Sequence, residues 1–234
     1  MRRFANALID LIYPAKCAGC GGLIGEVEVP PFCAKCDETV VETEGPLCLI
    51  CGIPSKGGEG RNFICPECSR EKPAFDRARC LFLYGGAVRD APLKLKYGSS
   101  PQVAGMFSGR FFGNLDFDCD LIMPVPLHKR RIIKRGYNQS VLIAVEASRA
   151  LKKPLDRRTL VRVRDTPPQS GLSRGQRFEN MKSAFGVSAP EKIRDRRILL
   201  VDDVITTGAT VNECAKVLKR CGAARVDVFA IARR

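Results

Sequence analysis

The chain has 234 residues and a formal net charge of +14, and hydrophobic residues make up 45% of it. That apolar share is ordinary for a globular protein and excludes an intrinsically disordered chain. No apolar run reaches the length of about 20 residues that a membrane-spanning helix needs, and the N-terminus lacks the pattern of a secretory signal. We therefore expect a cytoplasmic protein.

The charge is unevenly distributed along the chain. Residues 1–75 contain eight Lys or Arg and ten Asp or Glu, whereas residues 76–234 contain thirty-one and fifteen. The two parts therefore carry −2 and +16, and the second part is expected to meet an anionic partner. A phosphorylated ligand, a nucleic acid and an anionic membrane surface all fit this charge, and a solvated basic face is the simpler alternative.

The first residues show apolar side chains at helical spacing after two arginines. We expect residues 4–12 to form a helix that packs on its own domain. The same pattern permits at most a weak peripheral contact with a membrane.

Eight of the twelve cysteines form four Cys-x-x-Cys pairs, which argues for metal binding rather than disulfides. Two pairs supply the four thiolates of a tetrahedral site, so the spacing predicts two structural Zn2+ sites in a double zinc ribbon. Two pairs that are adjacent in the chain could share a zinc ion, or the pairing could be cross-braced, with the first pair joined to the third and the second to the fourth. A redox role of the Cys-x-x-Cys pairs is the less favoured alternative to metal binding. The paired residues are Cys17 and Cys20, Cys33 and Cys36, Cys48 and Cys51, and Cys65 and Cys68. The other cysteines, predicted to be buried thiols, are Cys80, Cys119, Cys214 and Cys221.

A boundary is expected near residues 73–76. It would separate the N-terminal helix and double zinc ribbon in residues 1–75 from a second domain in residues 76–234. In the second domain, short apolar runs predict strands and longer periodic runs predict helices, an alternation typical of an α/β domain. The expected strands are 78–84, 120–123, 160–163, 198–201 and 226–231, and the expected helices are 87–97, 103–112, 140–151 and one that begins near 211.

A basic stretch follows the strand expected at 120–123. Ligands of open α/β sheets bind beyond the carboxyl ends of the strands, so we expect this stretch to bind a pyrophosphate group. A solvated basic loop is the alternative. His128, the only histidine, is expected to be a hydrogen-bonding loop residue rather than a proton donor. The candidate pyrophosphate-binding residues are Pro126, Leu127, His128, Lys129, Arg130, Arg131 and Arg135.

Residues 164–182 are polar, begin with a proline-rich run and are expected to form a long irregular loop. Loops of this kind between core elements are usually functional or disordered. We predict a flexible lid that excludes water from a reactive intermediate. Its candidate ligand contacts are Gln169, Arg174, Arg177 and Asn180.

The stretch 198–210 combines a buried strand, two carboxylates and a Thr/Gly turn before a helix. Backbone N–H groups at a helix N-terminus bind phosphate, and threonine hydroxyls add donors. Asp202 and Asp203 suit the vicinal hydroxyls of a sugar, or a Mg2+ ion bound to them, and are the expected catalytic carboxylates. A phosphorylated ribose is therefore predicted; an Asp pair that caps an ordinary turn is the alternative. The expected phosphate-binding residues are Thr206, Thr207, Gly208, Ala209 and Thr210.

Residues 201–210 resemble the phosphoribosyl-pyrophosphate (PRPP) binding motif of type I phosphoribosyltransferases. Together with the four cysteine pairs and the segments 95–97, 124–128 and 135–139, they make the chain resemble the ComF/GntX family over nearly its whole length. The resemblance implies a double zinc ribbon joined to a type I phosphoribosyltransferase-like domain, with a mostly parallel sheet flanked by helices. It also implies PRPP with Mg2+ as the ligand and a link to natural transformation or the use of external DNA.

Two functions follow from these expectations. The first is transfer of the 5-phosphoribosyl group from PRPP to an unidentified acceptor. The second is a non-catalytic module that binds PRPP and single-stranded DNA during DNA import or processing, with components of the competence machinery as partners. The absence of tryptophan argues against a base-stacking platform, so electrostatic attraction would dominate DNA binding.

Overall fold

The computed structural model describes residues 16–24, 32–55, 63–89, 116–169 and 171–234. Its central sheet has four parallel strands in the order β1-β6-β5-β2. The bounds are Arg77–Leu83 for β1, Leu121–Pro124 for β2, Arg197–Ile205 for β5 and Arg225–Arg233 for β6. β5 and β6 are buried along most of their length, as central strands of a parallel sheet covered on both faces must be. The predicted α/β fold class is confirmed.

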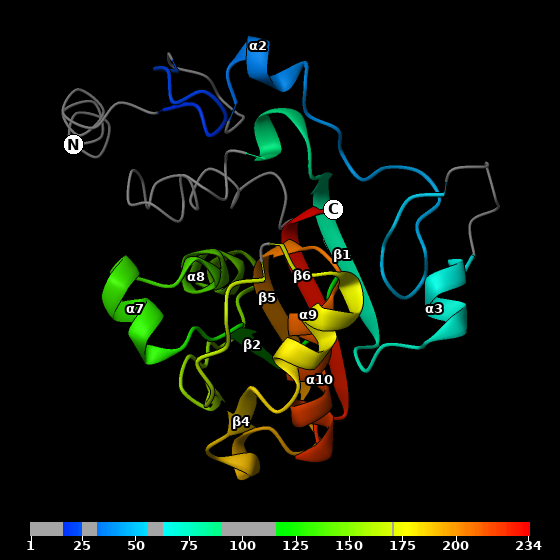
Figure 1. Ribbon diagram of the computed structural model, residues 1–234, viewed down its shortest axis with the longest axis vertical. Helices are drawn as coiled ribbons and strands as arrows, with labels where there is room; N and C mark the ends of the chain where they lie inside the picture. Colours follow the sequence, from blue (N-terminus) through cyan, green and yellow to red (C-terminus); the bar gives the residue numbers. More distant parts are fainter. Residues whose placement is uncertain (1–15, 25–31, 56–62, 90–115, 170) are drawn as a thin grey trace.

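Two helices cover opposite faces of this sheet. α8 (Gln139–Leu151) packs in one cluster with Leu199 and Val201 of β5, and α10 (Ala209–Arg220) packs in another with Ile198 and Leu200. Successive side chains of a strand point to opposite faces, so the two helices lie on opposite sides of β5. Figure 1 shows the sheet between them. Both helices were predicted from the sequence.

Strand β5 extends beyond its predicted end. Its apolar run ends at Val201, but the strand continues to Ile205 and stays paired with β6. Asp202 and Asp203 therefore lie within the strand, near its carboxyl end, and do not terminate it. The two carboxylates lower the local hydropathy, while the backbone ladder to β6 still holds these residues extended.

Two segments that were expected to be irregular contain helices. α7 (Lys129–Arg135) ends at Gly136, whose φ of 80° is the left-handed conformation common after a helix. α9 (Arg174–Met181) begins with a capping box, in which the Ser173 N–H donates to Gln176 Oε1 at 2.8 Å and Ser173 Oγ accepts from the Gln176 N–H. The prediction of a continuous irregular loop over residues 164–182 is therefore wrong for its second half.

The remaining elements lie outside the central sheet. β3 (Leu160–Arg162), predicted as a core strand, forms a separate antiparallel pair with β4 (Phe185–Val187). Two short 3-10 helices are η1 (Gly86–Arg89) and η2 (Pro190–Lys192). The helices predicted at 4–12 and 103–112, and most of the one at 87–97, lie outside the described residues. No helix in the described ranges is long and apolar enough to cross a membrane.

The N-terminal part covers the outer edge of β1. It contains α2 (Ala34–Asp37) and α3 (Pro66–Arg70), and residues 41–43, which follow α2, lie beside β1 (Figure 1). The Thr43 N–H donates to the Leu81 carbonyl and the Leu83 N–H donates to the Val41 carbonyl, both at 2.8 Å. These bonds occupy backbone groups that would otherwise form an open sheet edge.

Cysteines of this N-terminal part belong to the same hydrophobic clusters as the sheet. Cys17 packs in the hydrophobic cluster between α8 and the sheet, whereas Cys48 and Cys51 pack in the hydrophobic cluster between α10 and the sheet. The N-terminal part therefore contributes to both faces of the sheet. The division of the chain after residue 75 stays a prediction.

Candidate functional site

Asp202 and Asp203 lie near the carboxyl end of β5, where parallel α/β sheets bind ligands. Asp202 is 9% exposed, and its Oδ1 accepts hydrogen bonds from Ser140 Oγ at 3.0 Å and from the Asp203 N–H at 2.9 Å. Ser140 is held in the first turn of α8 by the capping residue Asn138, whose side chain accepts from the Ser140 N–H at 3.1 Å. The start of α8 and the end of β5 thus fix the position of the Asp202 carboxylate.

The turn after β5 leads directly into α10. Gly208 precedes this helix with a φ of +79°, and its position carries no side-chain capping bond. A Cβ placed there would meet no atom within 4 Å, so the backbone is open to a ligand. Thr210 Oγ1 accepts a hydrogen bond from Gln169 Nε2 at 2.9 Å. The partial positive charge of the helix N-terminus and the threonine hydroxyls suit a phosphate group.

A cleft of about 320 Å³ lies beside this turn. It joins side chains from the basic stretch, the expected lid and the end of β5, which are far apart in the sequence. The predicted residues that line it are Leu127, Arg131, Arg135, Gln169, Arg177, Asp202, Asp203, Thr206 and Thr210. One cavity therefore contains two carboxylates, threonine hydroxyls and several guanidinium groups.

Seven further residues line the cleft that were not among the predicted site residues, and Arg162 on β3 is the most unusual of them. It is 9% exposed, stacks over the Phe185 ring at 5.5 Å and hydrogen-bonds Thr166 Oγ1, while its Nε has no partner among the described residues. Burial and the neighbouring Arg131 lower the pKa of its guanidinium. The sequence feature that could have identified Arg162 is its position as the single charged residue within the otherwise apolar run 160–163. The seven are Tyr84, Val125, Gln139, Ser140, Arg162, Val204 and Arg234.

Three residues of the predicted pyrophosphate stretch lie close to the carboxylate of Asp165, and two of these three do not line the cleft. Asp165 Oδ1 lies 3.6 Å from His128 Nδ1 and 3.9 Å from Arg131 Nε, and its Oδ2 lies 3.6 Å from Arg130 Nη1. Lys129 is exposed, and Pro126 is half-buried before it. Of the basic residues in this stretch, the structure thus places Arg131 and Arg135 in the cleft.

Other predicted residues also lie outside the cleft. Ala209 is buried at the start of α10, and Asn180 Nδ2 donates to the Pro167 carbonyl at 3.1 Å. Arg174 Nη1 donates to Glu67 Oε2 at 2.8 Å, which joins α9 to α3. Thr207, Gly208 and Arg174 line a neighbouring cavity.

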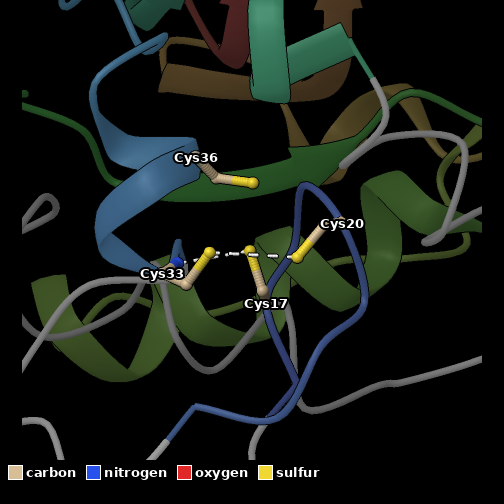
Figure 2. A group of neighbouring side chains, drawn as sticks. All are labelled: Cys17, Cys20, Cys33 and Cys36. Atoms are coloured by element: carbon tan, nitrogen blue, oxygen red, sulfur yellow. Dashed lines mark hydrogen bonds between the residues drawn. The ribbon is translucent and has the colours of Figure 1, made fainter.

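Eight cysteines form two clusters, and in each of them the four Sγ atoms lie within 4.8 Å of one another. The first cluster contains Cys17, Cys20, Cys33 and Cys36, and the second contains Cys48, Cys51, Cys65 and Cys68. Figure 2 shows that the first cluster joins one turn of the chain to the start of α2. Pairs adjacent in the chain therefore share a cluster, and the cross-braced alternative is wrong. Four sulfurs at this spacing fit a tetrahedral zinc ion with Zn–S bonds of about 2.3 Å.

Backbone donors favour the thiolate form in both clusters. The Cys33 N–H donates to Cys17 Sγ at 3.2 Å, and the Cys65 N–H donates to Cys48 Sγ at 3.3 Å. Burial acts to raise the pKa of these thiols, but the backbone N–H groups outweigh it and lower the pKa of Cys17 to about 6 and that of Cys48 to about 7. Burial raises the pKa of other thiols of the same clusters, to about 12 for Cys36 and to about 11 for Cys51. Thiolates are the form that binds a metal ion, so these thiols would release their protons when a cation binds.

Comparison with known families agrees with this arrangement. Residues 137–234 match the model of the phosphoribosyl transferase domain, and residues 8–69 match the model of the double zinc ribbon domain. The fold and the two cysteine clusters thus define a phosphoribosyltransferase-type domain joined to a double zinc ribbon.

Similar proteins place the chain more narrowly. It is 32% identical over 211 residues to the DNA utilization protein YhgH of Escherichia coli (strain K12). The aligned region covers 86% of this chain and 90% of the relative. It is 42% identical over 115 residues to Competence protein F of Haemophilus influenzae, about half of each chain. Competence protein ComFC of Bacillus subtilis is 24% identical over 86% of this chain and 83% of its own length. The chain belongs to the ComF family of competence and DNA utilization proteins.

Proposed function

We propose that the cleft binds PRPP together with Mg2+ and that the protein transfers the 5-phosphoribosyl group to an acceptor. One observation carries this proposal: the carboxylates of β5, the threonine turn before α10 and a group of arginines line a single cleft. The turn would bind the 5-phosphate, and Asp202 and Asp203 would accept hydrogen bonds from the ribose hydroxyls. The chemistry of these groups suits a ribose that carries phosphate at one end and pyrophosphate at the other.

The arginines would act on the leaving group. Transfer breaks the bond between ribose C1 and the pyrophosphate oxygen, so negative charge grows on pyrophosphate as the acceptor bonds to C1. Arg131, Arg135 and Arg177 line the cleft and can neutralise this charge. A bound Mg2+ would share that task, and the hard carboxylate oxygens of the cleft suit such an ion. Gln169, which already donates to Thr210, would help to exclude water.

Titration calorimetry with PRPP and Mg2+ tests the binding step. The double change Asp202→Asn and Asp203→Asn removes both carboxylates with little change in shape, and we expect affinity to fall by about a hundredfold or more, because charged hydrogen bonds are worth about 1.5–3 kcal/mol each. Asp195→Asn is the matched control, because this exposed residue has a left-handed backbone that Asn also tolerates. An unmodified protein that shows no affinity for PRPP with Mg2+ would sink the proposal.

Turnover needs a separate measurement. Pyrophosphate release from PRPP should appear when the correct acceptor is present and disappear in the double Asp variant. A panel of nucleobases, amines and oligonucleotides covers the main classes of nucleophile. PRPP binding without release in any of these mixtures would favour a non-catalytic role of the same cleft.

A second candidate function is binding of single-stranded DNA. It is favoured by the charge of +16 in residues 76–234 and by relatives named for DNA utilization and competence. Binding that rests on phosphate contacts weakens steeply as salt rises. We expect the double Asp variant to retain salt-sensitive binding of an oligonucleotide, and salt-independent binding would contradict an electrostatic surface.

A further inference from the structure

A basic face lies at the end of the central sheet opposite the PRPP cleft. Asp202 and Asp203 lie near the carboxyl end of β5, whereas Arg196 directly precedes Arg197, the first residue of that strand. A strand rises about 3.3 Å per residue, so about 20 Å separates Arg196 from Asp203. A ligand that occupies the cleft therefore leaves this face accessible.

Three segments form the basic face, and hydrogen bonds join them. Ser188 Oγ donates to the Arg158 carbonyl at 3.3 Å, which holds residues 156–158 beside residues 188–196. The Asp195 N–H donates to the Gly222 carbonyl at 2.8 Å, which holds residues 188–196 beside the end of α10. Cations that are far apart in the sequence are thereby brought to one end of the domain.

Six exposed lysine or arginine side chains belong to these segments. None of the six forms an ion pair with a carboxylate in the ranges that the structure describes, so their charges face solvent. They are Arg157, Arg158, Lys192, Arg194, Arg196 and Arg220.

The carboxylates of the same segments leave an excess of positive charge. Asp156 is half-buried and accepts from the backbone N–H groups of Arg158 and Thr159 at 2.8 and 2.9 Å. Glu191 and Asp195 are exposed and are the other two carboxylates. Six cations therefore stand against three carboxylates on this face.

Charges at the neighbouring strand starts do not remove this excess, because they are paired with one another. Four cations and four carboxylates are involved, so together they carry no net charge. The ion pairs are Arg197 with Asp118 and Asp120, Lys219 with Asp76, and Asp227 with Arg77 and Arg225.

The composition of the face selects among anionic partners. Protein interfaces have an apolar or aromatic core, and peripheral membrane segments insert apolar side chains. Residues 156–158, 188–196 and 220–222, all of which the structure describes, contain no large exposed apolar side chain. Five of the six cations are arginines, whose planar guanidinium groups form paired hydrogen bonds with phosphate oxygens.

We propose that the basic face binds the phosphate backbone of a nucleic acid strand. The proposal rests on DNA binding, the second candidate function above, and assigns it to a surface separate from the PRPP cleft. The three segments contain no aromatic residue on which bases could stack, so binding here would not depend on base sequence. A single strand and a duplex share this backbone chemistry.

Fluorescence anisotropy of a labelled oligothymidylate, titrated at several salt concentrations, tests the face on the full chain. One double variant is Arg157→Gln with Arg158→Gln, and the other is Arg194→Gln with Arg196→Gln. Each phosphate contact to a single strand contributes about 0.7 to the slope of log affinity against log salt, so each variant should lower that slope by about 1.4. Affinity near 0.1 M salt should fall about tenfold or more in each.

Lys35→Gln with Arg70→Gln is the matched control. Both residues are exposed in the N-terminal part, and the pair removes the same net charge at a distance from the face. The control should bind the oligonucleotide as the unmodified protein does. Circular dichroism checks that all three variants keep the fold, which is expected because every substituted side chain is exposed.

The outcomes separate the face from the function on which it rests. If the unmodified protein binds the oligonucleotide in a salt-sensitive way and both face variants match it in affinity and slope, this proposal fails while DNA binding stands. If the unmodified protein binds no nucleic acid, DNA binding and the face fail together. An equal loss in the control and the face variants also overturns the proposal, because it would report net charge alone.

Two further probes identify the partner. The same strand annealed to its complement supplies the duplex: a loss in the face variants with both probes supports the backbone of either form as the ligand, and a loss with the single strand alone supports single-stranded nucleic acid. Vesicles of anionic phospholipid supply a membrane surface. Face variants that lose vesicle binding but keep their affinity for both nucleic acids would overturn the proposal in favour of a membrane contact.

Discussion

The hydrogen bond between Ser140 and Asp202 is the contact on which the position of the cleft carboxylate most depends. Both residues are buried, and Ser140 Oγ lies 3.0 Å from Asp202 Oδ1. Ser140→Ala removes a donor to a buried charged group, so we expect a loss of about 1.5–3 kcal/mol in unfolding free energy and weaker PRPP binding. Urea denaturation followed by circular dichroism measures the first effect, since the chain has no tryptophan to report by fluorescence. Calorimetry measures the second.

Ser148→Ala is the matched control for this prediction. Ser148 lies on the same helix, and its Oγ donates to the Lys153 carbonyl at 2.6 Å, beyond the helix end. Its loss should cost about 1 kcal/mol of stability and leave PRPP affinity unchanged. If both variants bind PRPP as tightly as the unmodified protein, Asp202 does not need Ser140 to hold the ligand.

At the scale of elements, Asp120 joins the start of β2 to the start of β5. Its carboxylate accepts from Arg197 Nη2 at 2.7 Å, from Arg197 Nε at 3.1 Å and from the Arg197 backbone N–H at 2.9 Å. The Arg197 side chain, and then its backbone N–H, lower the pKa of Asp120 below its ordinary range. In the unfolded chain this carboxyl titrates near its usual value of about 3.9. The stabilisation is therefore complete above about pH 5 and is lost as the pH falls below 4.

We expect Asp120→Asn to lower the unfolding free energy by about 1 kcal/mol near pH 7, because the pair is partly exposed to solvent. The difference from the unmodified protein should shrink as the pH falls below 4, because this carboxyl becomes protonated first in the unfolded chain, while Asp120 of the folded protein keeps its lowered pKa. Urea midpoints across this range give the measurement, and effects of acid on the zinc sites are common to both proteins. Asp118→Asn, whose side chain is 67% exposed beside the same arginine, should show little of either effect. A constant difference at every pH would contradict the assigned role of Asp120.

Hydropathy and residue spacing predicted the elements of the central sheet, because those strands and helices are buried by apolar side chains. They failed for α7 and α9, whose sequences KRRIIKR and RGQRFENM contain few apolar residues and are stabilised by caps and local contacts. The motif at 202–210 located one side of the cleft. Arg162 was missed because its place in the cleft depends on the pairing of β3 with β4, which is not visible in a three-residue strand. Asp165 was missed for a similar reason, since its cationic partners lie about 35 residues earlier in the chain.

At the scale of the whole molecule, the two cysteine clusters contribute to both faces of one sheet. Cys17 of the first cysteine cluster packs in the hydrophobic cluster on the α8 side of the sheet. All four residues of the second cysteine cluster, Cys48, Cys51, Cys65 and Cys68, pack in the hydrophobic cluster on the α10 side. A zinc ion that holds each set of sulfurs would therefore stabilise the packing of α8 and α10 as well as the local loops. This arrangement predicts one cooperative unfolding transition rather than separate transitions for two domains.

Removal of zinc tests this coupling. Structural zinc sites contribute about 10 kcal/mol or more of apparent folding free energy in small peptides, which is comparable to the total stability of about 5–15 kcal/mol of a typical protein. We therefore expect a strong chelator to abolish the far-ultraviolet signal of α8 and α10 together with the N-terminal part, while metal analysis follows the loss of close to two zinc ions.

Cys65→Ser, in the fully buried second cluster, should lower the melting temperature more than Cys20→Ser, whose residue is exposed. Cys221→Ser lies outside both clusters and is the control. An unchanged melting temperature of the helical signal after chelation would contradict this coupling. It would show that the sheet and its helices fold stably without the metal-bound cysteine clusters.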